Sequence, residues 1–437
     1  MSVFPGRRLG LAAAAWTGVA LIATGFPALF APLLAALAVL LGLVAADMLA
    51  LRRLPPPDVA RELPDRVWIG QFAEVVLRIR NSAAVAIRVD VIDELPADLS
   101  GTDPTFPDVP VGPAQRVSLR YHVVPRVRGD RPLGRIALLI HSPMDFLRRR
   151  TLLDPRAVLR VYPDASRYLR REALDPERTL AVLGVKPVRR AGEGMEFETL
   201  RDYVPGDDLR RLDWAASARR GRPITRVYQH ERNHTVLIAM DASRLMAERC
   251  GERTKLDGAI DAALALAFVC IASGDRAGAL VFDRELRGAI APRAKRSQLG
   301  GILELLRPVQ PRPLEANYGA LLRTLAIRQR AFVVVFTDFV ETFEGMEPLV
   351  ALAKRHRVLL VALRAPVYEV LGTSRASGGG SSLDLYGRLV VDDLLREREM
   401  ALARLRQLGV QTLDTTPEQV VAPVINRYLQ FRYAPER

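Results

Sequence analysis

The stretch HTVLIAMDAS, His234 to Ser243, decides the fold of the second half of the chain. Its apolar run is unbroken until Asp241, which is typical of a short strand buried on both faces of a parallel sheet. The stretch AFVVVFTDF, residues 331–339, repeats this pattern and ends in Asp338. We therefore expect two central strands of an α/β sheet, each followed at its carboxyl end by an aspartate.

Segments with apolar residues at helical spacing separate these strands from one another. They are LDGAIDAALALAFVCIAS, SQLGGILELL, YGALLRTLAI, EPLVALAKRH, DLLREREMALARLRQLG and PEQVVAPVINRYLQF. Further apolar runs, GALVFD, VLLVALRA and VQTLD, read as additional strands. Strands that alternate with helices predict a doubly wound α/β domain over residues 234–437.

Three oxygen-bearing side chains fall at the carboxyl ends of the two central strands: Asp241, Ser243 and Asp338. Ligands of such sheets bind at this edge, and carboxylates with a hydroxyl suit a hard cation. The spacing therefore makes these residues a candidate Mg²⁺ site. The alternative is that Asp241 and Ser243 cap the turn or helix that follows the strand. Spacing alone leaves both interpretations open.

Between residues 66 and 163, apolar and polar residues alternate with a period of two. The runs are VWIGQFAEVVLRIRN, AIRVDVIDEL, RVSLRYHVV and RIALLIHS, separated by Asn, Asp, Gly and Pro. This is the pattern of antiparallel strands with one buried face. We expect a β-sandwich domain over residues 54–165, serving as a spacer or as a docking surface.

Near the N-terminus, Leu9 to Ala46 contains no charged residue. As one helix it would be about 57 Å long, nearly twice the hydrocarbon core of a bilayer. Gly25-Phe26-Pro27 interrupts it, which predicts a hairpin of two spans, 9–25 and 27–50, within a domain of residues 1–53. Arginines at 7, 8, 52 and 53 flank the hairpin. Positive flanks stay cytoplasmic, so we expect an inner-membrane protein whose soluble domains lie in the cytosol.

The composition is strongly basic. The 437 residues include 63 Lys and Arg, of which four are Lys, and the net charge is +14. Such a balance suits nucleic acid or an anionic membrane surface, and the hairpin favours the membrane. We therefore predict the bilayer, and no nucleic acid, as a partner. Cys250 and Cys270 stand without a CxxC motif, which signals neither a disulfide framework nor a zinc site.

A connector, residues 166–233, joins the two soluble domains and carries YVPGDDLRRLDWAASARRG, Tyr203 to Gly221. Pro205-Gly206 predicts a turn, Asp207 an N-cap, and Gly221 the end of a short helix. The helix would have one apolar face. That face consists of Leu209, Leu212 and Ala216.

Four roles are open to this stretch: catalysis, nucleic-acid binding, an Arg/Asp network that locks the connector to the α/β domain, or a partner-docking face. Trp and Arg dominate interface energetics, which favours docking over the first two. The candidate partner-binding residues are Tyr203, Asp207, Arg210, Asp213, Trp214 and Arg219.

The run from Arg201 to Arg219 resembles the signature of the bacterial family known as "domain of unknown function 58". That signature reads R-x-Y-x-x-G-D-x-x-R-x-I-D-W-x-x-x-A-R, and Leu212 replaces its Ile. The resemblance implies a von Willebrand factor A-like C-terminal half. It also implies a metal-ion-dependent adhesion site at Asp241, Ser243 and Asp338. Leu245 stands where that site has its second Ser, and residues 315–318 lack its Thr.

Members of the family tend to be encoded beside MoxR-type AAA+ ATPases, which implies a shared role in protein maturation or assembly. We therefore expect a non-enzymatic adaptor between such an ATPase and a client protein. The chain has no Walker A loop, so ATP-driven work would come from the partner. The alternatives are a divalent-metal-dependent binding module and an envelope-maturation enzyme, for which the sequence shows no catalytic constellation.

Overall fold

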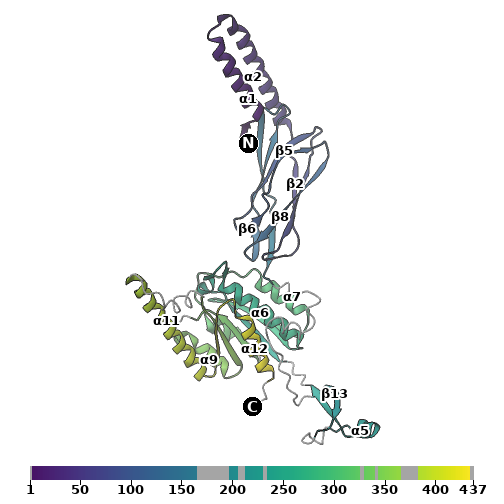
Figure 1. Cartoon of the computed structure of the whole chain (residues 1–437), viewed down its shortest axis with the longest axis vertical. Coiled ribbons are helices and arrows are strands. Elements are labelled where there is room, and N and C mark those ends of the chain that lie inside the picture. Colours follow the sequence, from purple (N-terminus) through teal and green to yellow (C-terminus); the bar gives the residue numbers. More distant parts are fainter. Residues whose placement is uncertain are drawn as a thin grey trace. The chain divides into compact units, whose positions relative to one another are not determined.

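The computed structural model describes residues 2–164, 196–204, 212–229, 234–324, 329–339, 343–365 and 382–433. The chain forms two compact units, Met1–Tyr162 and Pro163–Arg437 (Figure 1).

The first unit contains two long helices and a set of short strands. Its helical elements are α1 (Arg7–Ala23), η1 (Pro27–Leu29) and α2 (Phe30–Arg53). Its strands are β1 (Ser2–Pro5), β2 (Asp58–Glu62), β3 (Val67–Trp68), β4 (Ala73–Arg80), β5 (Ile87–Asp93), β6 (Leu99–Gly101), β7 (Thr105–Val111), β8 (Arg116–Pro125), β9 (Gly129–Pro132), β10 (Ile136–His141), β11 (Leu147–Leu153) and β12 (Val158–Tyr162).

Two sheets of this unit share one hydrophobic core. Their strand orders are β1-β11-β10-β5-β7 and β2-β4-β8-β6, beside a shorter sheet β3-β12-β9. Every second residue of β4 is buried from Ala73 to Ile79, and β5 alternates in the same way. Side chains from both sheets, such as Val75 and Val89, meet in a single cluster. The sheet-rich middle predicted from the alternating runs is confirmed.

Helix α2 is long and apolar enough to cross a membrane. It has 24 residues, a mean hydropathy of 2.4 in its most apolar window, and 6% of that window is buried. Helix α1 has 17 residues and contacts α2. The two helices lie side by side in Figure 1. Exposed leucines, isoleucines and valines on both helices leave a large apolar surface without a protein covering.

The base of this helical pair is built into the sandwich. Strand β1 precedes α1 and pairs antiparallel with β11. At the end of α2, the buried carboxylate of Asp47 accepts hydrogen bonds from the Ser142 hydroxyl, the Met144 N–H (2.9 Å) and the Phe146 N–H (3.3 Å). The buried Arg149 guanidinium donates to the backbone carbonyls at residues 51 (3.0 Å) and 54 (2.7 Å).

Met1–Tyr162 form one compact unit, so the helical pair and the sandwich are joined across the expected boundary at residues 53 and 54, which itself stays a prediction. Leu51 belongs to the sandwich core, and residues before and after the helical pair both bond to β11 or its preceding turn. The sequence pattern misses this because β1 is four residues long and lies directly before the apolar run.

The second unit contains the connector elements and an α/β domain. The connector elements are β13 (Glu196–Asp202), α5 (Trp214–Arg220) and β14 (Ile224–Gln229). The strands of the α/β domain are β15 (Thr235–Asp241), β16 (Arg249–Cys250), β17 (Arg253–Thr254), β18 (Arg276–Phe282), β19 (Leu286–Arg293), β20 (Phe332–Thr337), β21 (Arg357–Leu363) and β22 (Gln411–Thr415). Its helical elements are η4 (Arg244–Ala247), α6 (Lys255–Ala272), α7 (Ser297–Leu306), α8 (Tyr318–Thr324), η5 (Phe343–Met346), α9 (Glu347–Ala353), α11 (Ser382–Gln407) and α12 (Val421–Arg432).

Six strands of this domain form one sheet, in the order β19-β18-β15-β20-β21-β22. All neighbours are parallel except β19, which runs antiparallel to β18. Leu237 and Val333 pack in a core with side chains of α8, α9 and α11. The alternate residues Ile238 and Val334 point to the opposite face and are also buried, and α6 contacts β15 and β18. Helices α6, α9 and α12 surround the strands in Figure 1.

Candidate functional site

The two central strands of the α/β sheet end side by side at a point where the strand order reverses. From β15 the chain adds β18 and β19 on one side of the sheet, and then β20, β21 and β22 on the other. In open α/β sheets the ligand crevice lies at such a point, beyond the carboxyl ends of the strands. Asp241 ends β15 and Thr337 ends β20, with Asp338 next in sequence. The structure thus brings the predicted aspartates to one edge.

The Asp241 carboxylate accepts hydrogen bonds from groups at the same edge of the sheet. Its Oδ2 accepts from the Thr337 hydroxyl at 2.6 Å, and its Oδ1 accepts from the Ser243 N–H at 2.8 Å. The Tyr318 hydroxyl lies 2.8 Å from Thr337 Oγ1 and completes a chain of three buried side chains. The Asp241 carboxylate therefore caps the turn after β15. Ser243 precedes η4, but its side chain makes no capping hydrogen bond there.

Asp338 is held by positive charges instead. Its Oδ2 lies 2.6 Å from the Lys255 ammonium, and its Oδ1 lies 3.2 Å from the Arg398 guanidinium. The ammonium also contacts the Glu248 carboxylate, and Arg398 reaches Asp414 at 3.1 Å. We call these residues, with Asp241 and Thr337, the carboxyl-edge cluster.

Lys255 is fully buried although it is the first residue of a helix. A capping box fixes that end of α6, since the Thr254 side chain and Asp257 exchange hydrogen bonds with each other's backbone. A cation at a helix N-terminus is disfavoured by the helix dipole. Burial alone would lower the pKa of Lys255, but the Asp338 and Glu248 carboxylates outweigh burial and raise that pKa above its ordinary value. The lysine is therefore held as an ammonium ion by its neighbours.

This arrangement does not fit a divalent cation at the predicted residues. Mg²⁺ requires oxygen ligands at about 2.0–2.1 Å in a near-octahedral shell. Both oxygens of Asp338 already contact cationic nitrogens, and both oxygens of Asp241 accept hydrogen bonds within the edge. Position 245, which would supply a further hydroxyl, is a leucine. Within the described ranges, no group of three or more His, Cys, Asp or Glu side chains is arranged to hold a metal.

The connector forms a small motif around helix α5. Strands β13 and β14 pair antiparallel, and the segment between them includes α5. The Asp213 side chain accepts from the Ala216 N–H at 2.9 Å as the N-cap, and Gly221 ends the helix with a left-handed φ of 66°. The Ser217 hydroxyl accepts from the N–H at the start of β14 at 2.8 Å.

The predicted start of this helix is corrected by the structure. Leu212, expected on the helical face, forms a β-bridge with Thr225, and the helix begins at Trp214. Asp213 is the N-cap because its side chain reaches the backbone N–H three residues ahead, as a cap requires. Asp207 and Arg210 lie outside the described residues.

The surface of this motif combines an exposed aromatic side chain with positive charge. Trp214 is 74% exposed. Arg219, on the same helix, is exposed and donates from its side chain to the Ala215 carbonyl at 3.2 Å. Tyr203 is half-buried, and its N–H donates to the Pro223 carbonyl at 3.0 Å. Four of the six predicted partner-binding residues, 203, 213, 214 and 219, therefore lie in one small motif.

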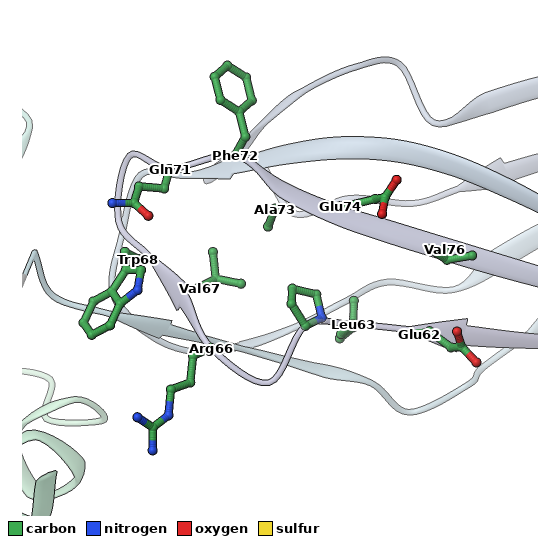
Figure 2. Close-up of a pocket in the computed structure, with 11 residues that line it drawn as sticks. Glu62, Leu63, Arg66, Val67, Trp68, Gln71, Phe72, Ala73, Glu74 and Val76 are labelled. Atoms are coloured by element: carbon green, nitrogen blue, oxygen red, sulfur yellow. The ribbon is translucent and has the colours of Figure 1, made fainter. Parts of the chain in front are cut away.

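The β-sandwich has a separate hollow of about 350 Å³ at one end of β4. Apolar residues such as Val67 and Val76 line it together with two glutamates, 62 and 74 (Figure 2). The ring of Phe72 points away from the other lining side chains and is 81% exposed. The hollow contains none of the residues predicted to be functional.

A known family model matches part of the second unit. Residues 199–375 match the family model described as "Protein of unknown function DUF58". This DUF58 region includes α5, β15, β20 and the residues of the carboxyl-edge cluster other than Arg398 and Asp414.

The relatives of this region are themselves described as uncharacterized. They include the protein Rv1480 of Mycobacterium tuberculosis and Mb1516 of Mycobacterium bovis, each 32% identical over 181 residues. The match covers 40% of this chain and 56% of either relative, so the chain spans little more than half the length of these proteins.

Solved structures show weaker likeness. The mussel byssus proximal thread matrix protein 1 matches 46% of this chain and 47% of its own, with 12% identity and a TM-score of 0.28. The Escherichia coli alpha-2-macroglobulin, from its MG7 domain to its C-terminus, matches 25% of this chain and 17% of its own, with 19% identity and a TM-score of 0.20.

Sequence reasoning missed the two cations of the carboxyl-edge cluster. Lys255 is 83 residues from Asp338 in sequence and Arg398 is 60 residues away. One local signal was present, because Lys255 is one of only four lysines among 63 basic residues and opens a nearly uncharged apolar segment. Arg398 lies in a charged helix with many arginines and has no such signal.

Proposed function

We propose that this chain is a membrane-anchored adaptor of the DUF58 family. It would hold a MoxR-type AAA+ ATPase near a client protein and perform no catalysis of its own. The exposed Trp214 on the capped helix α5 carries the proposal, because a large aromatic side chain beside arginine is the usual centre of a protein interface.

The anchor in this proposal is a two-span hairpin with the soluble domains in the cytosol. Support comes from the apolar surface of α1 and α2 and from their mutual contact. Exposed arginines at 7, 8, 52 and 53 lie at the base of the pair. Arginines that flank a short hairpin favour the cytoplasmic face and anionic lipid headgroups.

The α/β domain in this proposal is von Willebrand factor A-like. Support comes from the strand order and from the meeting of Asp241 and Asp338 at the reversal point, where that family has its adhesion site. The ion pairs of Asp338 favour the adaptor over a metal-dependent binding module, since they occupy a carboxylate that a metal would need.

The test is affinity capture of the tagged full-length chain from an unwashed membrane fraction, solubilised in detergent, with and without Mg²⁺-ATP. A parallel sample of the same membranes is extracted with carbonate to test the anchor. We expect a MoxR-type ATPase to be recovered with the wild type. Trp214→Ala/Arg219→Ala should reduce recovery at least about tenfold, as loss of an interface centre does.

Phe72→Ala is the matched control, because it removes an equally exposed aromatic side chain from the other unit. If recovery of the ATPase falls equally in both variants, α5 is not the docking site. Absence of any such ATPase would reject the adaptor, and release of the chain by carbonate would reject the anchor.

A further inference from the structure

We propose that the Lys255 ammonium takes the place of a divalent cation in the carboxyl-edge cluster, so that this edge of the sheet is complete without metal. Its nitrogen lies 2.6 Å from Asp338, and its side chain has no exposed surface. The inference concerns the chemistry of the edge and does not depend on the proposed adaptor role.

Helix α6 places Lys255 at the carboxyl edge of the sheet. The two parallel strands that meet at this reversal point carry Asp241 and Asp338 at their ends, and a buried carboxylate needs a cation or hydrogen-bond donors to offset its charge. Helix α6 begins at this edge, and its capping box fixes the backbone of its first turn. The ammonium is thereby delivered to Asp338 by a rigid element and not by a mobile loop.

A metal ion would have to compete with Lys255 and Arg398 for the carboxylate oxygens of Asp338. Lys255 contacts one of its oxygens and Arg398 the other. A metal ion bound to either oxygen would approach a cationic nitrogen closely at a site of low dielectric, where repulsion between like charges is strong. Metal binding therefore requires that the Lys255 ammonium, whose side chain is fully buried, leave Asp338.

A lysine suits position 255 better than an arginine would. An ammonium is a compact point charge with three donors, whereas a guanidinium is a planar fork that suits paired oxygens. Lysine is rare in this chain, four residues among 63 basic ones, yet it stands at this position. The compact ion can contact Glu248 and Asp338 together, as a metal ion would.

The experiment compares Lys255→Ala with Lys255→Met in the detergent-solubilised full-length chain. Alanine removes the ammonium and leaves space for an ion, whereas methionine removes the charge but fills the space. Unfolding temperatures are measured in EDTA and in Mn²⁺ or Mg²⁺. We expect no metal effect on the wild type. Lys255→Ala should gain roughly 3–6 °C when free metal is ten times its dissociation constant.

Lys255→Met should gain nothing from metal, and adding Asp338→Asn to Lys255→Ala should abolish the gain. If Lys255→Ala folds only when Mn²⁺ is present, the proposal is supported. It is overturned if the variant is unfolded in both conditions, or if it responds no more than Lys255→Met. A metal-dependent gain in the wild type that Asp338→Asn removes would also overturn it.

Discussion

Asp47 in the first unit and Asp338 in the second are both buried carboxylates that join distant parts of the chain, but their partners differ in kind. Asp47 bonds to Ser142, 95 residues away, and to two backbone N–H groups. Asp338 bonds to Lys255, 83 residues away, and to Arg398. The first carboxylate is offset by dipoles and the second by formal charges.

A buried carboxylate can be stabilised either by hydrogen-bond donors or by ion pairs. The cost of removing its charge differs between the two. Hydrogen-bond donors of one turn hold Asp47, which makes no ion pair with any residue that the structure describes, so loss of its charge leaves only these donors to satisfy. Ion pairs hold Asp338, so loss of its charge leaves Lys255 with Glu248 alone and Arg398 with Asp414 alone, which is more costly than a weakened hydrogen bond. Asparagine substitutions separate the two cases because they preserve shape and remove charge.

The largest effect is expected for Asp338→Asn. The variant leaves Lys255 with only Glu248 and Arg398 with only Asp414, and we expect a loss of about 3 kcal/mol in unfolding free energy, the lower end of what breaking a buried ion pair costs. Thermal and denaturant unfolding of the solubilised chain measure it. A loss below about 1 kcal/mol would show that the ion pairs contribute little.

Lys255→Met serves as the control in a double-mutant cycle with Asp338→Asn. When the two charges are removed together, the combined loss should be smaller than the sum of the single losses. Additive losses would mean that the two side chains act independently.

An intermediate effect is expected at Asp275, a third buried carboxylate with mixed partners. It accepts from the Tyr428 hydroxyl and from the His234 N–H (3.0 Å), and lies 3.3 Å from Arg432. Burial raises its pKa to about 6, against the lowering effects of Arg432, Tyr428 and the His234 N–H.

A carboxyl whose pKa is raised by folding stabilises the protein below its unfolded pKa, and this contribution is lost as the pH rises through the folded value. The stability of the wild type relative to Asp275→Asn should therefore fall by about 1–3 kcal/mol between pH 4 and pH 7. Unfolding temperatures of both proteins over this range measure it. Parallel curves would contradict the raised pKa.

The smallest effect is expected for Asp47→Asn. The amide oxygen can still accept from the Met144 N–H, while the amide nitrogen replaces the oxygen that faces Ser142 and Phe146. We expect a loss of about 1–2 kcal/mol, typical of one or two weakened buried hydrogen bonds. Unfolding of the variant beside Asp338→Asn tests the comparison directly, since equal losses at the two sites would remove the distinction.

Local pattern predicts much of the fold. The apolar runs that begin at Thr235 and Phe332 become strands β15 and β20, and the alternation near Ala73 becomes β4. These features depend on side-chain period and on the residues that end each run. The aspartate that ends β15 and the aspartate that follows β20 meet at one edge because neighbouring parallel strands have their carboxyl ends on the same side of the sheet.

The start of α5 shows a limit of local reasoning. The sequence predicts Asp207 as the N-cap because it follows a Pro-Gly turn, whereas the structure has Asp213 as the N-cap of α5. Within the described residues, Leu212 is drawn into a bridge with Thr225, so the helix begins after it. The pairing partner of a residue is not encoded in its immediate neighbours.

By itself the sequence determined the apolar N-terminal segment, the alternating middle, the strands and helices of the second unit, and the aspartates at their ends, since each depends on nearby residues. Only the tertiary structure decided what offsets those aspartates. Lys255 and Ser142 reach their carboxylates across 83 and 95 residues of chain. Contacts of that range depend on how elements pack, and the buried polar groups must then find whatever donor or charge the packing supplies.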